Sequence, residues 1–207
     1  MSQRALIIVD VQNDFLPGGA LPVPDGHKII PVINRAQEKF DLIVATKDWH
    51  PAHHGSFASN YPDRAPGELI DLFGVQQVLW PDHCIQDSPG AEFPERLDTT
   101  GIKKIFLKGT HPRVDSYSSF FDNARKNSTG LEQYLKKKKV TTLYFTGLAT
   151  DYCVKYSVLD AIDLGFRSYL VKNGCKGIDL RPGDVERAEA EMEAAGAGLL
   201  RGVDIPG

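Results

Sequence analysis

The alternation of strand-length apolar runs with helical stripes constrains the fold of this chain most. Five runs predict strands, at residues 4–10, 42–46, 104–108, 142–146 and 167–171. Most are apolar at nearly every position, as strands covered on both faces must be. Apolar residues recur at helical spacing in residues 29–40, 131–135, 154–162 and 185–192. Strands that alternate with helices pair in parallel through right-handed crossovers, so we expect an α/β fold: a doubly wound, mainly parallel sheet with helices on both faces.

The length of 207 residues fits one globular domain, and we expect it to span residues 1–207. One stretch differs from the rest: residues 47–101 are rich in Pro, Gly, His and Asp and only weakly periodic. A loop-rich insertion of this length inside a compact domain is more often functional than idle.

Charge and hydropathy exclude several classes of protein. Lys and Arg number 24 against 27 Asp and Glu, so the chain lacks the basic surface expected of a nucleic-acid-binding protein. No apolar run approaches the ~20 residues that span a bilayer, and the start of the chain shows no cleavable signal pattern. Three cysteines without paired spacing favour reduced thiols over disulfides. We therefore expect a cytoplasmic protein without a nucleic-acid or membrane partner.

Chemically active side chains stand at the carboxyl ends of the predicted strands, where open parallel sheets bind their ligands. Asp10 ends the first strand, Lys108 ends the third, and Cys153 follows the fourth. At a helix start and beside a lysine, we expect the pKa of the Cys153 thiol to be lowered. Each residue has a commoner structural explanation, as a helix cap, a solvent-facing lysine or a small core residue. Their coincidence at one edge favours acyl transfer, with Asp10 as proton acceptor and backbone N–H groups holding an oxyanion.

A second group of polar residues predicts a metal site. In an extended segment, Asp48 and His50 point to the same side, and His83 would be the third ligand. Two imidazoles and one carboxylate suit zinc, and also iron or manganese. Spacing alone does not bring His83 to the other two, and loop histidines are more often surface residues.

Aromatic residues also fall in predicted loops. Phe15, Trp80 and Tyr117 could wall a pocket for a flat ring, although aromatic side chains more commonly fill gaps in a core.

Several segments carry a resemblance to a known family. They are DVQNDFLPGGAL at residues 10–21, KDWHPAHHGSFAS at 47–59, WPDHC at 80–84, LKG at 107–109, VDSYSSFFDN at 114–123 and TGLATDYCV at 146–154. In these motifs, and in their order along nearly the whole chain, the sequence resembles the nicotinamidases, also called pyrazinamidases, of the isochorismatase-like cysteine hydrolase family. The WPDHC and KDWHPAHHGSFAS segments mark the metal-containing amidases of that family.

The resemblance implies roles for individual residues. Asp10, Lys108 and Cys153 match the family's catalytic triad, and the amides of Ala149 and Cys153 match its oxyanion hole, next to a cis bond between Leu148 and Ala149. The matching metal ligands are Asp48, His50 and His83, and the matching ring-pocket residues are Phe15, Leu21, Trp80 and Tyr117. The family adds a further ligand of variable type, for which alignment favours Ser56 and donor chemistry favours His54.

The function implied is hydrolysis of nicotinamide to nicotinate and ammonia through a cysteine thioester, a step of NAD salvage, with pyrazinamide as a further substrate. We expect one divalent metal ion, with zinc favoured over iron and manganese. The oligomeric state stays open, a homo-oligomer included. One alternative is a related amidase or isochorismatase-type hydrolase with another substrate. Another is a non-catalytic ligand-binding module, although the segment after the first strand lacks a glycine-rich phosphate cradle.

Overall fold

The computed structural model describes residues 4–206 and is built on a six-stranded sheet in which every neighbouring pair is parallel. The strand order is β5-β2-β1-β6-β7-β8. The strands are β1 (Arg4–Val9), β2 (Ile43–Asp48), β5 (Ile102–Lys108), β6 (Thr142–Leu148), β7 (Arg167–Lys176) and β8 (Gly198–Leu200). The predicted parallel α/β fold is confirmed.

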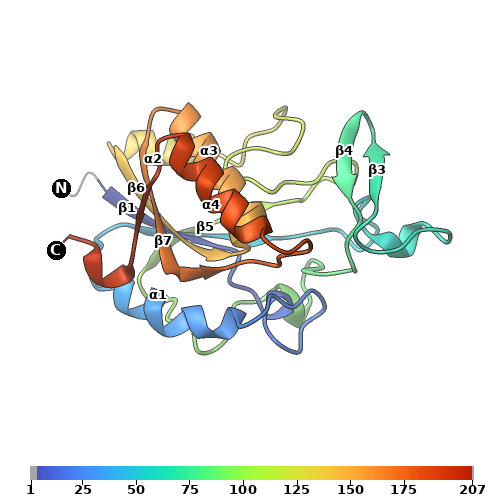
Figure 1. The fold of residues 1–207 in the computed structure, drawn as a ribbon, viewed down its shortest axis with the longest axis horizontal. Coiled ribbons are helices and arrows are strands. Elements are labelled where there is room, and N and C mark those ends of the chain that lie inside the picture. The colour runs from blue at the N-terminus through green and yellow to red at the C-terminus, as the bar shows by residue number, and fades with distance from the viewer. Residues whose placement is uncertain (1–3, 207) are drawn as a thin grey trace.

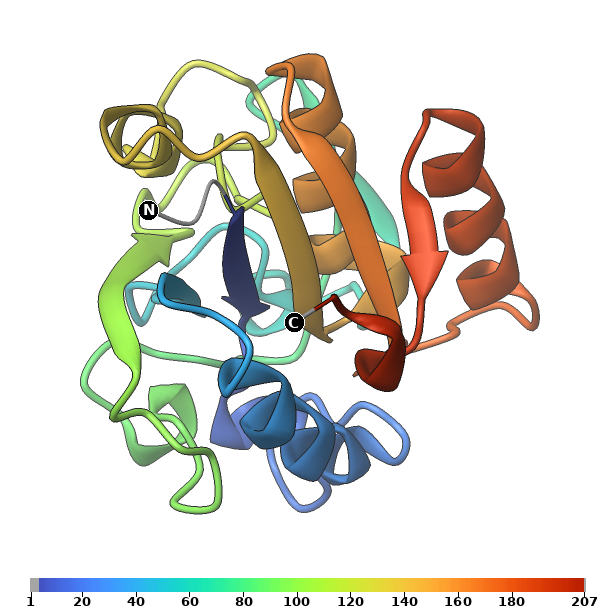
Figure 2. The same ribbon diagram turned by 90° about the vertical axis from the view of Figure 1, so that its left-hand side faces the viewer.

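Helices cover both faces of the sheet (Figures 1 and 2). Helix α1 (Ile30–Gln37) lies on one face, and α2 (Leu131–Lys137), α3 (Lys155–Asp163) and α4 (Asp184–Ala194) lie on the other. Along β1, Ile7 packs into the apolar cluster beneath α2 and α3, while its neighbour Ile8 packs into the cluster beneath α1. Burial on both faces explains why the strand sequences show no polar alternation.

Several strands extend beyond their apolar runs. Strand β2 continues to Asp48, β6 to Leu148 and β7 to Lys176, because the added residues are paired by neighbouring strands although their side chains are partly polar. The short edge strand β8 was not predicted. Pro31 lies in the first turn of α1, where the missing N–H costs no helical hydrogen bond.

The stretch from residue 47 to residue 101 is mostly loop, with one antiparallel hairpin of β3 (Leu69–Leu72) and β4 (Val75–Val78). In Figure 1 this hairpin lies at the opposite end of the molecule from both termini, on the side toward which β1 runs. Within residues 4–206, no helix has the length and apolar character needed to cross a membrane.

Candidate active site and metal centre

Three chemically active side chains meet beyond the ends of non-adjacent strands. Lys108 ends β5 and Asp10 directly follows β1, with β2 between these strands. The Lys108 Nζ forms an ion pair with Asp10 Oδ2 at 2.8 Å and donates to Cys153 Sγ at 3.3 Å. Lys108 is 2% exposed and Asp10 is fully buried. The predicted convergence of acid, lysine and thiol is therefore present in the structure.

Cys153 reaches this cluster through the turn between β6 and α3. Residues 150–154 form one π-helical turn, and the peptide bond between Leu148 and Ala149 is cis. Just before it, Gly147 has a φ of 120°, and a Cβ there would lie 2.7 Å from the backbone nitrogen of Val9. Only glycine allows β6 to approach β1 this closely, which brings the Cys153 turn beside Asp10.

The electrostatics of the cluster differ from the sequence prediction in one respect. Burial raises the pKa of the Cys153 thiol well above its usual value; Lys108 lowers it, but Asp48 and Asp10 raise it further. The predicted lowering of this pKa is therefore wrong, because desolvation and the nearby carboxylates outweigh the single amine. The thiol stays protonated until a base takes its proton.

Asp10 has the properties of such a base. Burial raises its pKa to about 6, against the opposing effects of Lys108 and of a hydrogen bond from Thr46. The Thr46 hydroxyl donates to Asp10 Oδ1 at 2.6 Å. The Lys108 amine stays charged, because the attraction of Asp10 and Asp48 outweighs its burial and raises its pKa. A carboxylate with a pKa near neutrality suits reversible proton transfer.

Asp48, His50 and His83 come together next to this cluster, with their ligand atoms within 4.8 Å of one another. His50 Nε2 lies 3.8 Å from Asp48 Oδ2, and His83 Nε2 lies 4.0 Å from the same oxygen. His83 therefore does join the Asp-x-His pair, which spacing alone did not establish.

The imidazole hydrogen bonds fit a metal ion. The Nδ1 atoms of His50 and His83 lie 2.9 Å and 2.8 Å from the backbone carbonyls of Gly109 and Pro81. These contacts assign the proton to Nδ1 and leave the Nε2 lone pairs facing Asp48. His50 Nε2 is buried without a hydrogen bond. Burial lowers the pKa of both rings to about 4, so both are neutral, as metal ligands must be.

The two candidates for a further ligand contact each other. His54 Nδ1 lies 2.7 Å from Ser56 Oγ, and His54 Nε2 lies 3.3 Å from the carbonyl of Val114. Both side chains are fully buried, and the His54 ring lies 4.4 Å from that of His50. Both therefore lie beside the candidate metal site.

A pocket opens onto Cys153 from between these elements. Its lining comprises Phe15, Leu21, Asp48, Trp80, His83, Asp115, Tyr117, Ala149, Tyr152, Cys153 and Ile178. Every residue expected to wall a ring pocket is among them, and so are both residues expected to supply the oxyanion hole. The Trp80 Nε1 donates to Tyr117 Oη at 3.1 Å, which ties two of the aromatic walls together.

Two residues of this region had no role in the sequence prediction. Asp115, in the loop after β5, lies beside His50, and Gln77 of β4 donates to Asp115. Asp115 stood inside the recognised VDSYSSFFDN segment, so its acidic side chain was a usable signal. No feature of the sequence indicated Gln77, because the contact between the hairpin and this loop exists only in the tertiary structure.

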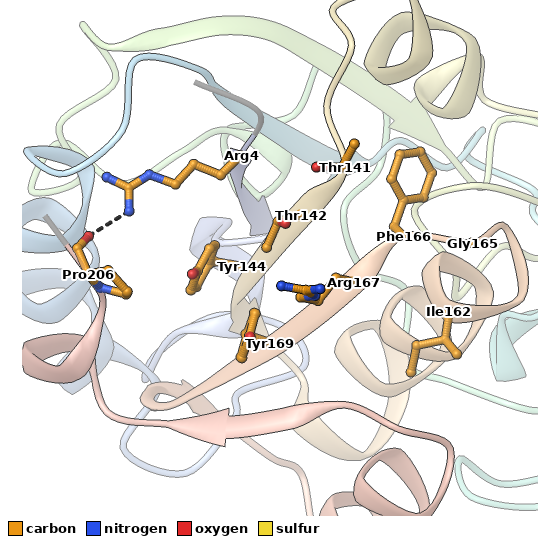
Figure 3. A pocket seen from close by; sticks show the side chains of 10 residues that line it. All are labelled: Arg4, Thr141, Thr142, Tyr144, Ile162, Gly165, Phe166, Arg167, Tyr169 and Pro206. Carbon is orange, nitrogen blue, oxygen red and sulfur yellow. Dashed lines mark hydrogen bonds between the residues drawn. The ribbon is translucent and has the colours of Figure 1, made fainter. Parts of the chain in front are cut away.

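A much larger cavity, of about 850 Å³, lies elsewhere, near the amino ends of β1, β6 and β7. Figure 3 shows its lining, in which Arg4 donates to the Pro206 carbonyl and the rings of Tyr144 and Tyr169 stack on each other. Its lining holds no thiol, imidazole or carboxylate side chain. The chemistry therefore lies in the smaller pocket at Cys153.

The parallel sheet and this site together define the class of α/β hydrolases. The chain belongs to the isochorismatase family: the family model described as "Isochorismatase domain" matches residues 4–201.

Individual relatives agree with the motif resemblance, which is confirmed. The nicotinamidase of Escherichia coli (strain K12) is 46% identical over 205 residues, which are 96% of this chain and 95% of that protein. The solved nicotinamidase and pyrazinamidase of Acinetobacter baumanii superposes with a TM-score of 0.96 at 43% identity, covering 100% of this chain and 99% of that one. The pyrazinamidase of Pyrococcus horikoshii, solved in complex with zinc, gives a TM-score of 0.77 at 40% identity, with coverage of 97% and 99%.

Proposed function

We propose that the protein is a nicotinamidase, which hydrolyses nicotinamide to nicotinate and ammonia and also accepts pyrazinamide. One observation carries this proposal: the Lys108 amine lies 2.8 Å from the Asp10 carboxylate and 3.3 Å from the Cys153 sulfur. These groups stand at a pocket walled by aromatic rings. The identity of 46% to a nicotinamidase over nearly the whole chain supports the choice of substrate.

In the proposed complex, the pyridine ring lies between Phe15 and Trp80, with the carboxamide carbon against Cys153 Sγ. Leu21 and Tyr117 close the pocket around the ring. Aromatic and aliphatic walls bind a flat, weakly polar ring by burial and stacking, and a few polar groups orient its amide.

Acylation begins when Asp10 takes the Cys153 proton as the sulfur attacks the amide carbon. The oxygen of the tetrahedral intermediate accepts hydrogen bonds from the backbone N–H groups of Ala149 and Cys153. Asp10 then gives its proton to the leaving nitrogen, the C–N bond breaks, ammonia departs and a thioester remains. Lys108 balances the negative charge that moves between the sulfur and the carboxylate.

Deacylation repeats these steps with water. Asp10 removes a proton from water as its oxygen attacks the thioester carbon, and the same backbone amides hold the oxyanion. The C–S bond breaks, the Cys153 sulfur takes the proton back from Asp10, and the product leaves as nicotinic acid, which gives its proton to solvent to become nicotinate. The chain ends the cycle in its starting protonation state.

Asp48, His50 and His83 would hold one divalent ion, for which zinc is favoured by the donor set and by the zinc complex of the P. horikoshii relative. Iron and manganese are the alternatives. When bound, the ion supplies a Lewis acid at the edge of the substrate pocket. Ser56 or His54 would add a further contact.

The direct test is ammonia release from nicotinamide by the metal-loaded protein, with pyrazinamide and an N-carbamoyl amide in the same assay. Isochorismate, which contains no nitrogen, is tested in parallel by release of pyruvate. We expect nicotinamide and pyrazinamide to be turned over and the other two to be poor substrates. Faster turnover of a carbamoyl amide or isochorismate would assign the protein to another activity of the family. Tight ligand binding without turnover of any of the four would indicate a non-catalytic module.

A further inference from the structure

The site holds more buried negative charge than its lysine balances. Three carboxylates lie around the metal group: Asp10, Asp48 and Asp115 are 0%, 4% and 3% exposed. Lys108 contacts the first two of them, while the Nδ1 atoms of His50 and His83 contact backbone carbonyls and neutralise none of the three. An excess of buried charge is costly unless it is paired, and a divalent cation would pair it.

Asp115 is placed to share that cation. Its Oδ1 lies 3.9 Å from His50 Nε2, and Asp48 Oδ2 lies 3.8 Å from the same nitrogen. Since His50 Nε2 is fully buried and has no hydrogen bond, its lone pair faces a space bordered by both carboxylates. His50, His54 and Asp115 also bring their ligand atoms within 4.8 Å of one another.

We infer that Asp115 is a second carboxylate of the metal centre, which contacts the divalent cation directly or through one bound water, and that Gln77 positions it. The inference rests on the proposed metal site of Asp48, His50 and His83.

The hydrogen bonds of Asp115 favour this role. Ser116 N donates to its Oδ1 at 2.7 Å, and Gln77 Nε2 donates to its Oδ2 at 3.0 Å. Each oxygen therefore has a donor that holds it in place and keeps a further lone pair.

Gln77 also links the metal centre to the substrate pocket. Its Nε2 lies 2.9 Å from the Tyr117 hydroxyl, and its Oε1 accepts from Asn123 Nδ2 at 3.2 Å. The Asn123 side chain in turn accepts from the backbone N–H of Tyr117. Because Gln77 lies on β4, this network joins the hairpin of Figure 1 to the loop that carries Asp115 and Tyr117. A buried amide with several partners fixes the side chains around it.

The test is metal affinity, measured without turnover. Apoprotein is titrated with Zn²⁺ in competition with a chromophoric chelator, for the wild type and for Asp115→Asn, Gln77→Leu and His83→Ala. Loss of an outer partner of a metal ligand typically weakens binding ~10 to 100-fold, so we expect the dissociation constant of Asp115→Asn to rise by that factor. Gln77→Leu should raise it less, because the carboxylate remains.

Asp122→Asn is the matched control, because it removes a carboxylate of the same loop that lies outside the candidate metal site. The Asp122 carboxylate accepts from the backbone N–H groups of Lys126 and Asn127 and from Asn127 Nδ2. Its dissociation constant should stay within about twofold of wild type. The visible spectrum of the Co²⁺ protein gives a second readout, because it responds to the donors and geometry at the ion. We expect Asp115→Asn to change this spectrum and Asp122→Asn to preserve it.

The outcomes separate the inference from the proposed function. Wild-type Zn²⁺ affinity and an unchanged Co²⁺ spectrum in Asp115→Asn would overturn the role of Asp115 and leave the proposed site intact. A wild-type protein that binds no ion, or a His83→Ala variant that binds as the wild type does, would overturn the proposed metal site itself. If Asp115→Asn does not fold, judged by its apoprotein melting curve, unchanged affinity in Gln77→Leu would overturn the positioning network.

Discussion

Lys108 forms an ion pair with Asp10 across the end of an intervening strand, with 2.8 Å between the amine nitrogen and Oδ2. Their strands, β5 and β1, are separated by β2, so the contact depends on the full length of the lysine side chain. The same nitrogen contacts Asp48 and donates to the carbonyl of Ser116 at 2.8 Å. One amine thereby joins the proposed catalytic acid to the proposed metal site.

This geometry makes Lys108 sensitive to shape as well as charge. The side chain is buried among four partners, so a guanidinium, which is larger and planar, would displace Asp10 or Cys153. We predict that both Lys108→Arg and Lys108→Met lower kcat/KM for nicotinamide by at least about 100-fold. Lys104→Arg, an exposed change on the same strand, is the control. Near-normal kinetics of Lys108→Arg would show that charge alone suffices.

Removal of the thiol tests the covalent route. Cys153→Ala should lower kcat by about 10⁴-fold or more, because the remaining groups cannot form a thioester. Its melting temperature should stay close to that of wild type, since the lost atom is small. The matched variant Cys175→Ala removes a second buried free thiol, outside the pocket, and should keep the wild-type rate. Appreciable turnover by Cys153→Ala would eliminate the sulfur as nucleophile.

The pH dependence should report the Asp10 carboxyl. Its pKa is raised to about 6, and only its ionised form can accept the thiol proton, so kcat/KM should fall as the pH drops below about 6 and level off above it. A hydrogen bond from Thr46 lowers this pKa, so Thr46→Val should move the acidic limb to higher pH. If the pH profiles of the wild type and Thr46→Val are superimposable, the acidic limb does not report the ionisation of Asp10.

Metal removal should be reversible. We predict that a chelator abolishes ammonia release and that added Zn²⁺, Fe²⁺ or Mn²⁺ restores it, with the ranking of the three ions indicating which one the site prefers. His83→Ala should not recover under the same repletion, because one of the two imidazoles is gone. An enzyme indifferent to chelation, with no bound metal by elemental analysis, contradicts a role for the ion.

The sheet could be predicted because its signal is local. Continuous apolar runs, such as Leu6 to Val9, bury both faces of a strand, and their alternation with helical stripes leaves few topologies. The same rule of topology places Asp10 and Lys108 at one edge, as predicted. The hairpin and β8 had no such signal, because their exposed or half-buried residues do not alternate clearly.

The environment of each group could not be predicted in the same way. The predicted lowering of the Cys153 pKa considered only the helix start and the nearby lysine. In the structure the sulfur is also buried and lies near the carboxylates of Asp48, Asp10 and Asp115, and these effects raise its pKa. Asp115 lies in one of the motifs that carry the resemblance, but its proposed role at the metal site follows only from its position beside His50 in the structure.

The amino-acid sequence by itself determined the parallel α/β architecture and the residue types available at the carboxyl edge of the sheet, because hydrophobic periodicity and strand ends are properties of neighbouring residues. Only the tertiary structure decided that His83 joins Asp48 and His50, that Gln77 holds Asp115, and that the thiol is protonated at rest. These outcomes depend on the distances between segments that are remote in sequence and on the removal of water from their side chains. Both are set by the packing of the whole fold and not by neighbouring residues.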